Sequence, residues 1–162
     1  DTVVDMLDYI LPDDLIIEGD KDLVRTNTEA TLLVYMADKN GKGGQEYASD
    51  GHSLDIPLAV LVNGESASAS EVFTGAVMDY DAGIVVGTTT FGKGIVQNLI
   101  PLGDGTAIKL TTAHYYTPNG FDLHGKGLEP DVVVEMDEEL QKKAVVELSE
   151  DNQLQAAIEA MN

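Results

Sequence analysis

The sequence predicts a single α/β domain with a mixed-sheet core, in which a βαβ unit is followed by β-hairpins and two C-terminal helices. The first observation is the order of an apolar strand at 57–62, an amphipathic helix at 68–80 and a second strand at 84–86. That order is typical of a crossover between parallel strands. The second is a change to consecutive strands and turns after residue 95. The third is size, because 162 residues, 43% of them apolar, suffice for one core spanning residues 1–162.

The N-terminal third combines one helix with short strands. Apolar residues recur with a period near 3.6 over residues 2–11, which predicts a helix that Pro12 ends. Residues 15–18 and 31–37 have the character of short strands, and the second is apolar enough to be buried on both faces. Residues 38–54 are polar and rich in glycine, so we expect a long surface loop, a length that proteins tolerate mainly beside functional regions.

Strands dominate the region after residue 95. The segments 95–100 and 107–116 flank the sequence Gly-Asp-Gly at 103–105, which is a hairpin signal. Thr-Pro-Asn-Gly at 117–120 predicts a turn. We therefore expect a hairpin followed by a tight reversal of the chain.

The C-terminal end is predicted to hold a last short strand at 132–135 and two helices. The first helix is expected at 137–148. Asp151 is placed to cap the second helix. Four residues form the apolar stripe of that second helix: Leu154, Ala157, Ile158 and Met161.

Composition and charge exclude several classes of function. The formal net charge is −20, which argues against nucleic acid and anionic membrane surfaces as partners because both would repel the chain. The absence of cysteine excludes disulfides, thiolate zinc sites and a cysteine nucleophile. No apolar run is long enough to span a membrane, and the start shows no signal peptide. Because the chain starts at Asp1 rather than Met, and almost inside a helix, we expect a piece of a longer protein.

The most informative stretch is VLVNGESASASE, at 60–71, where a buried strand turns into a helix through small residues. A helix start presents unpaired N–H groups, so Ser68 would lie beside donors able to hold an oxyanion, the N–H of Ala69 first among them. A structural alternative stands beside this one. Ser68 and Glu71 fit the capping box S-x-x-E, and on this stretch alone capping is favoured because caps are common.

A second turn, TFGKGIVQ at 90–97, places Lys93 between two glycines after a buried strand. A lysine held in a tight apolar setting loses hydration, which favours the neutral amine that can act as a base. Lys93 and Gln97 would project from one face of a strand, so that Gln97 could orient the amine. The alternative is a solvated lysine in a surface turn, which the pattern alone favours.

Taken together, these turns resemble the C-terminal processing peptidases, or tail-specific proteases, of the S41 group. The resemblance is close over 57–158 and continues through LGDGTAIKLTTAHYYTPNG and GKGLEPDVVVE to QLQAAIEA. The ordered combination is far more specific than any single motif. The resemblance implies a ClpP/crotonase-like fold and a serine endopeptidase that uses a Ser–Lys dyad to cleave proteins near their C-terminal tails.

The resemblance also implies the role of each site residue. Ser68 would be the nucleophile, Lys93 the general base, and Gln97 the residue that supports the lysine. Asp79 occupies the place of an acid that matters in the family, although a solvated surface acid at this position is an equal alternative. The implied partner is a protein or peptide substrate with an extended tail, and the implied location is outside the cytoplasm.

Family members carry a PDZ domain and a Gly-Gly turn ahead of the region that corresponds to residue 1. The turn is thought to supply a second oxyanion donor, whose loss typically costs about 10²–10³ in rate. We therefore expect the isolated chain to be weakly active or inactive, with the PDZ domain of the parent chain as a partner. A homo-oligomer is left open.

Other functions remain as alternatives. The chain could be a binding or scaffold domain that kept the protease fold without activity, or a crotonase-like acyl-CoA enzyme, which lacks support from CoA-type signals. His114 and His124 could suggest a Ser-His-Asp triad, but structural roles are favoured for both. Because the histidines lack the i, i+4 spacing of a zinc protease, we expect no metal and no other cofactor.

Overall fold

The computed structural model describes most of the chain: residues 2–12, 15, 30–38, 40, 42, 44–51, 53, 54 and 56–162. The strand expected at 15–18 lies outside the described residues except for Leu15. Within the described part, no helix is both long enough and apolar enough to cross a membrane.

The predicted βαβ unit is confirmed. Strand β3 (Ala59–Val62) leads through helix α2 (Ala69–Asp79) to strand β4 (Ile84–Gly87), and the two strands pair in parallel from Ala59 opposite Ile84. Strand β7 (Val132–Val133) pairs in parallel with the other edge of β4. The resulting order is β3-β4-β7, with β4 central. The strand expected at 132–135 is therefore shorter than predicted.

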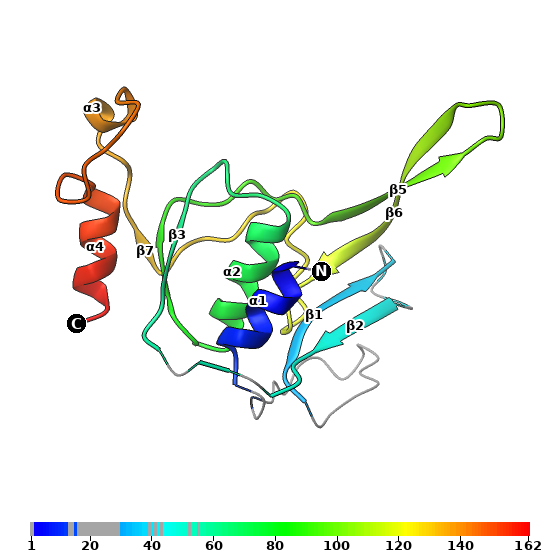
Figure 1. Cartoon of the computed structure of the whole chain (residues 1–162), viewed down its shortest axis with the longest axis horizontal. Helices are drawn as coiled ribbons and strands as arrows, with labels where there is room; N and C mark the ends of the chain where they lie inside the picture. Colours follow the sequence, from blue (N-terminus) through cyan, green and yellow to red (C-terminus); the bar gives the residue numbers. More distant parts are fainter. Residues whose placement is uncertain are drawn as a thin grey trace.

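A second, antiparallel sheet has the order β2-β1-β6-β5. Strand β1 (Leu32–Ala37) lies between β2 (Gly44–Ala48) and β6 (Ala107–Tyr116), and β5 (Ile95–Pro101) forms the far edge. Figure 1 shows the β5–β6 hairpin projecting from the body of the molecule. The predicted hairpin is confirmed.

The hydrophobic core lies where helix α1 (Thr2–Ile10) and α2 pack together beside β1 (Figure 1). Its buried members come from α1, α2 and β1 and from the residue that follows α1: Leu7, Leu11, Leu33, Val34, Val72, Ala76 and Val77. The core therefore fixes α2, and with it the turn that precedes α2.

Two predicted elements were wrong. The loop expected over 38–54 contains strand β2, whose polar residues pair with β1 at an exposed edge. An edge strand needs few apolar residues, so composition did not reveal it. The helix expected over 137–148 is limited to α3 (Glu138–Gln141). Val145 and Leu148 are more than 70% exposed, and a short helix is not stable without a surface on which to pack.

The last helix agrees with its prediction at the N-terminus. Helix α4 (Asn152–Ala160) starts after Asp151, whose carboxylate accepts hydrogen bonds from the N–H groups of Gln153 and Leu154, both at 3.0 Å. Ala157 is buried, whereas Ile158 and Met161 are 43% exposed. The expected apolar stripe is thus only partly covered.

Candidate active site

Ser68 lies between β3 and α2, as the N-cap residue of the helix, and its backbone has φ 57° and ψ −111°. A side chain other than glycine rarely adopts a positive φ, so this conformation is strained. The preceding turn is fixed by its own hydrogen bonds, since Glu65 N–H donates to Asn63 Oδ1 at 2.9 Å and Ser66 N–H to the Asn63 carbonyl at 2.9 Å. Backbone strain of this kind persists where surrounding contacts enforce it, which is a feature of functional sites.

Glu71, in the first turn of α2, is fully buried and accepts four hydrogen bonds. Its Oε1 accepts from the Thr90 hydroxyl at 2.6 Å and from the Gly92 N–H at 2.6 Å. Its Oε2 accepts from the Ser68 N–H at 2.9 Å and from the Lys93 N–H at 2.7 Å. All four partners are donors, so an ionised carboxylate satisfies them and is itself satisfied without water.

The two turns singled out in the sequence therefore meet at one atom. The backbone nitrogens of Ser68 and Lys93 are both within 3 Å of Glu71 Oε2. Because both nitrogens donate to this one oxygen, they cannot lie farther apart than the sum of the two hydrogen-bond lengths. Glu71 thus does reach back to the N-cap, as the capping alternative predicts, but it also joins the serine turn to the lysine turn.

Further hydrogen bonds hold the lysine turn in place. Phe91 N–H donates to the Ser66 carbonyl at 2.9 Å, and the Leu128 N–H donates to the Thr90 hydroxyl at 2.8 Å. Gly92 has φ +86°, and a Cβ there would lie 2.9 Å from the Gly127 nitrogen, so only glycine fits. The turn is therefore packed between the serine turn and the segment that follows residue 121.

The structure places the side chains of Lys93 and Gln97 differently from the expectation. Lys93 is exposed, so its side chain does not show the predicted loss of hydration. Its backbone N–H donates to the buried Glu71 carboxylate, while its side chain faces solvent. Gln97 Nε2 donates to Thr111 Oγ1 at 3.4 Å rather than to Lys93. The register of β5 against β6 shifts between Val96 and Gln97, where Thr112 of β6 has no partner, and this shift places Gln97 opposite Thr111.

Ala69 is the first residue of α2 and is exposed. Within the described part of the chain, its N–H has no hydrogen-bond acceptor. This N–H follows Ser68 directly at a helix N-terminus, where the helix dipole favours negative charge. The oxyanion role expected for it stays a prediction.

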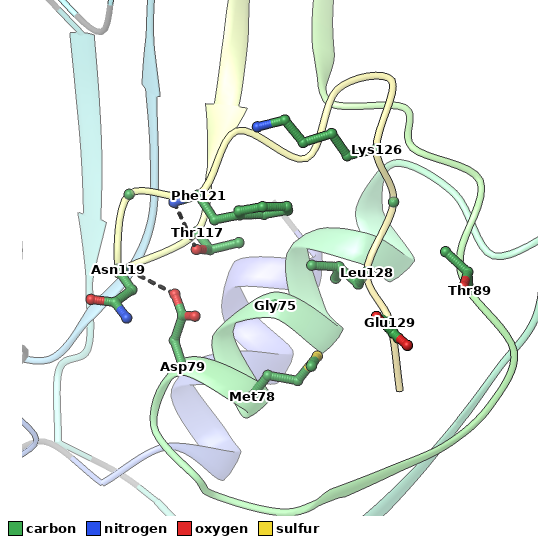
Figure 2. Close-up of a pocket in the computed structure, with 12 residues that line it drawn as sticks. Gly75, Met78, Asp79, Thr89, Thr117, Asn119, Phe121, Lys126, Leu128 and Glu129 are labelled. Carbon is green, nitrogen blue, oxygen red and sulfur yellow. Dashed lines mark hydrogen bonds between the residues drawn. The ribbon is translucent and has the colours of Figure 1, made fainter. Parts of the chain in front are cut away.

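Asp79 lies at the other end of α2 from Ser68. An α-helix of this length spans about 16 Å, so Asp79 does not contact the serine. Its carboxylate accepts the Asn119 N–H at 2.6 Å and lines a cavity of about 720 Å³ (Figure 2). Burial raises the pKa of the Asp79 carboxyl, although hydrogen bonds from Thr117 and Asn119 act in the opposite direction. Asp79 therefore fixes the turn at 117–120.

A smaller cavity, of about 310 Å³, opens beside the serine turn. Three elements line it: α1 contributes Val3 and Met6, β3 contributes Val60, Leu61 and Val62, and the start of α2 contributes Ala69, Ser70, Phe73 and Thr74, with Ser66 from the turn. The lining is mainly apolar and includes the residue that follows Ser68. The cavity can therefore hold an apolar side chain next to the serine.

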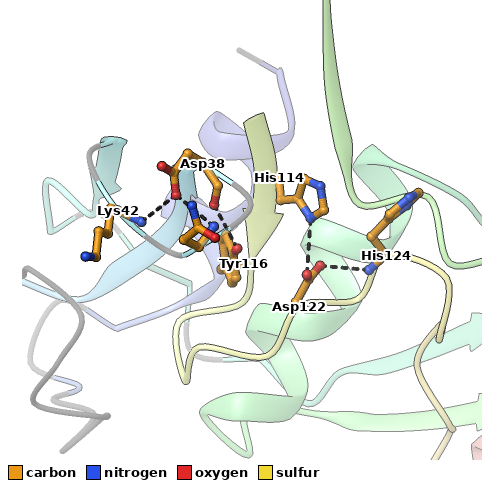
Figure 3. Close-up of polar contacts among 7 residues, drawn as sticks. Asp38, Lys42, His114, Tyr116, Asp122 and His124 are labelled. Carbon is orange, nitrogen blue, oxygen red and sulfur yellow. Dashed lines mark hydrogen bonds and ion pairs between the residues drawn. The ribbon is translucent and has the colours of Figure 1, made fainter. Parts of the chain in front are cut away.

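The two histidines form a separate cluster (Figure 3). His114 Nδ1 lies 3.1 Å from Asp122 Oδ2, and the ring of His114 contacts the ring of His124 edge to face, with centroids 5.1 Å apart. Asp122 Oδ1 also accepts the His124 N–H at 3.1 Å. These contacts account for both rings as local structure. Within the described part of the chain, no group of three or more His, Cys, Asp or Glu side chains is placed to hold a metal ion.

Sequence reasoning missed the full role of Glu71 and the role of Thr90. One signal was available, because Glu71 lies beside Val72 on a helix that must bury one face, and a buried carboxylate requires donors. Which donors it meets depends on the return of the chain after β4, which sequence does not specify.

The sequence of this chain is similar to those of known proteases. The sequence profile of peptidase family S41 matches residues 4–134. A carboxyl-terminal-processing protease of Synechocystis sp. is 41% identical over 114 residues, which cover 70% of this chain and 27% of that protein. A carboxy-terminal-processing protease of Bartonella bacilliformis is 54% identical over 79 residues, covering 49% of this chain and 18% of the relative.

A solved structure shows the same arrangement of the chain. The photosystem II D1 C-terminal processing protease matches with a TM-score of 0.67 and 34% sequence identity, over 82% of this chain and 30% of that one. The chain thus spans between about a fifth and a third of the length of these relatives.

Proposed function

Because the chain belongs to peptidase family S41, we propose that it carries the nucleophile and the base of a C-terminal processing serine endopeptidase, Ser68 and Lys93. The observation that carries the proposal is the pair of hydrogen bonds from the Ser68 and Lys93 N–H groups to one oxygen of Glu71. A serine becomes nucleophilic only beside a base, and lysine can serve in that role.

In the proposed mechanism, the neutral amine of Lys93 takes the proton of Ser68 Oγ as that oxygen attacks the peptide carbonyl. The Ala69 N–H holds the negative oxygen of the tetrahedral intermediate. The intermediate collapses to an acyl-enzyme, and the leaving amine takes a proton from Lys93. Water then attacks the ester and gives a proton to Lys93, and Lys93 passes that proton to Ser68 Oγ as the serine leaves, which restores the hydroxyl and the neutral amine.

The exposure of Lys93 has a consequence for this mechanism. Water around a lysine side chain favours the charged form, which has no lone pair to accept a proton, so the side chain must lose that water before it acts as a base. A substrate strand laid over the two turns would exclude that water. Gln97 would support the amine in that state, which requires it to exchange its long contact with Thr111 for one with Lys93.

Asp79 acts at a distance in this proposal, as a positioning residue. It holds the Asn119 N–H, and the chain from that turn continues to Leu128, whose backbone pairs with Thr90 beside the lysine. The apolar cavity next to Ala69 would receive a side chain adjacent to the scissile bond. We further propose that the core is of the ClpP/crotonase-like type, since the βαβ unit with its serine at the start of the crossover helix fits that fold.

The whole protein would act on the extended C-terminal tails of other proteins, outside the cytoplasm. The names of the relatives support the tail specificity, and one relative from Tetradesmus obliquus is named a chloroplastic C-terminal processing peptidase. A PDZ domain of the parent chain would engage the substrate, and a Gly-Gly turn would supply the second oxyanion donor. We therefore expect weak or no turnover by these 162 residues alone.

The test is labelling of Ser68 by a small fluorophosphonate, followed by mass spectrometry, because this reaction needs the nucleophile and base but little substrate binding. The wild-type chain should be labelled faster as the pH rises and the amine loses its proton. Ser68→Ala should abolish labelling, and Lys93→Arg should slow it by at least about 10²-fold. Ser70→Ala, two residues away, is the matched control. No labelling of the wild-type chain at any pH would favour a fold-retaining scaffold domain, and labelling that persists unchanged in Lys93→Arg would exclude Lys93 as the base.

A further inference from the structure

The distal part of the β5–β6 hairpin, residues 96–113, is a two-stranded ribbon. Strand β6 pairs with β1 only at its end, where His114, Tyr115 and Tyr116 face Ala37, Met36 and Tyr35. Beyond that point, the described residues supply no third strand. Figure 1 shows the ribbon projecting away from the body of the molecule. An isolated two-stranded hairpin is marginally stable in water, so this ribbon is suited to gain a partner.

The surface of the ribbon is apolar and almost without charge. Five of its large apolar residues are between 43% and 70% exposed: Leu99, Ile100, Leu102, Ile108 and Leu110. Although the net charge of the chain is −20, the ribbon contains only one acidic and one basic residue. The acid, Asp104, is engaged by the N–H and hydroxyl of Thr106 within the hairpin turn, at 2.9 and 2.6 Å. The ribbon is therefore a neutral apolar surface on a protein that otherwise repels anions.

The hydrogen-bond register identifies which backbone groups of β5 face outward. Leu102 N–H donates to the Thr106 carbonyl at 2.9 Å, so these opposite residues form a hydrogen-bonded pair. Bonded and non-bonded pairs alternate along an antiparallel ladder, and Leu99 faces Lys109 in a non-bonded pair. The N–H and C=O of Leu99, and likewise of Gln97, thus point away from β6. Pro101 occupies the next such position, where the missing N–H costs no ladder bond.

This outward edge is continuous with the candidate active site. Strand β5 begins two residues after Lys93, and Leu99 lies about 13 Å from the start of the strand. A peptide paired with the edge would therefore run from the ribbon toward the two turns. The register shift between Val96 and Gln97 lies between the ribbon and the turns, and such irregularities are common beside functional sites.

We propose that the outer edge of β5 binds an extended apolar segment of the polypeptide substrate as an added strand, with Leu99 as the main contact. This inference rests on the proposed peptidase function, because only a polypeptide substrate would extend from the dyad. The backbone of the added strand pairs with Gln97 and Leu99, and its apolar side chains cover Leu99. The neutrality of the ribbon selects apolar segments over acidic ones.

The test compares two proline variants at the same cross-strand pair. Leu99→Pro removes an outward N–H of β5, whereas Lys109→Pro removes an outward N–H on the opposite edge of the ribbon, and neither removes a ladder bond. The probe is a fluorescein-labelled decapeptide of alternating valine and threonine, with binding to the 162-residue chain followed by fluorescence anisotropy. Loss of one backbone hydrogen bond predicts a Kd at least ~5-fold higher for Leu99→Pro and a change below about twofold for Lys109→Pro.

A second measurement does not depend on variants. Amide hydrogen exchange of Gln97 and Leu99 should slow when the peptide is bound, while exchange at Lys109 stays the same. Equal weakening by both prolines, no peptide binding, or a dimer of the chain that Leu99→Pro dissociates would each overturn the proposal, the last in favour of a second copy as the partner. Fluorophosphonate labelling of Ser68 separates these results from a failure of the peptidase function, because it involves no ribbon contact.

Discussion

At each end of helix α2 a carboxylate binds a distant loop, but the number of hydrogen bonds and the burial differ between the two ends. At the N-terminal end, the Glu71 carboxylate binds backbone and hydroxyl donors from the serine turn and the lysine turn, and it is fully buried. At the C-terminal end, the Asp79 carboxylate binds the Asn119 N–H beside an open cavity and is half-buried. Each carboxylate attaches a distant loop to the helix.

The difference between the ends lies in access to water. If the Asp79 carboxylate is removed, water in the cavity can accept the hydrogen bonds from its former donors. Donors that lose Glu71 have no such replacement, and an unsatisfied buried donor costs about 1–3 kcal/mol. The end that holds Ser68 and Lys93 is therefore rigid, whereas the end at Asp79 can adjust.

The largest expected effect is therefore at Glu71. Glu71→Ala leaves the N–H groups of Ser68, Gly92 and Lys93 and the Thr90 hydroxyl without their acceptor. We expect the free energy of unfolding to fall by about 4 kcal/mol, measured by urea denaturation. Fluorophosphonate labelling of Ser68 should be lost in the fraction that remains folded.

Glu71→Gln is the matched control, because it keeps the shape and one acceptor oxygen but turns an NH₂ group toward donors. It should cost about half as much. A loss below about 1 kcal/mol for Glu71→Ala would contradict the idea that this end cannot be solvated.

A smaller effect is expected in the middle of the helix, at Gly75. A Cβ there would lie 2.5 Å from Thr117 Cγ2, so the close approach of the helix and the 117–120 turn depends on glycine. Although alanine favours helices, we expect Gly75→Ala to lower the free energy of unfolding by about 1–2 kcal/mol. Adding Thr117→Ser removes the clashing methyl group and keeps the hydroxyl, so the double variant should recover most of the loss. No recovery would mean that the turn is positioned by something other than this contact.

The smallest effect concerns the charge of Asp79. Burial raises the folded-state pKa of this carboxyl above its ordinary value of 3.8, so the protonated form favours folding. Relative to Asp79→Asn, the wild type should gain stability as the pH falls through the raised pKa, and the gain should be complete below 3.8. Urea midpoints of both proteins from pH 7 to 3.5 give this difference, in which the titration of the other acids cancels. A wild type that instead loses stability relative to Asp79→Asn as the pH falls would reverse the assigned sign.

Much of the fold follows from local sequence pattern. The crossover from 57–62 to 84–86 and the hairpin around 103–105 depend on apolar periodicity and on glycine, which act within a few residues. The capping of α4 by Asp151 follows from the same kind of local chemistry. Strand β2 and the true length of α3 did not follow, because an edge strand and an unpacked helix are decided by what lies beside them.

In the candidate site, too, some features follow from local sequence and others depend on tertiary contacts. Ser68 and Lys93 could be proposed from their turns and from the family resemblance, and the N–H of Ala69 could be proposed from the helix start. The exposure of Lys93 and the contact of Gln97 with Thr111 could not be foreseen, because they depend on how β5 leaves the turn and on a one-residue register shift. The junction at Glu71 depends on tertiary contacts between segments about twenty residues apart.

The shared oxygen of Glu71 makes assembly of the site a cooperative event. Opening of the first turn of α2 releases the Ser68, Gly92 and Lys93 amides together, since all three donate to one buried carboxylate. A partly formed site, with an ordered serine and a displaced lysine, is therefore not a stable intermediate of local unfolding. The serine turn and the lysine turn are therefore held together as one unit and are released as one unit.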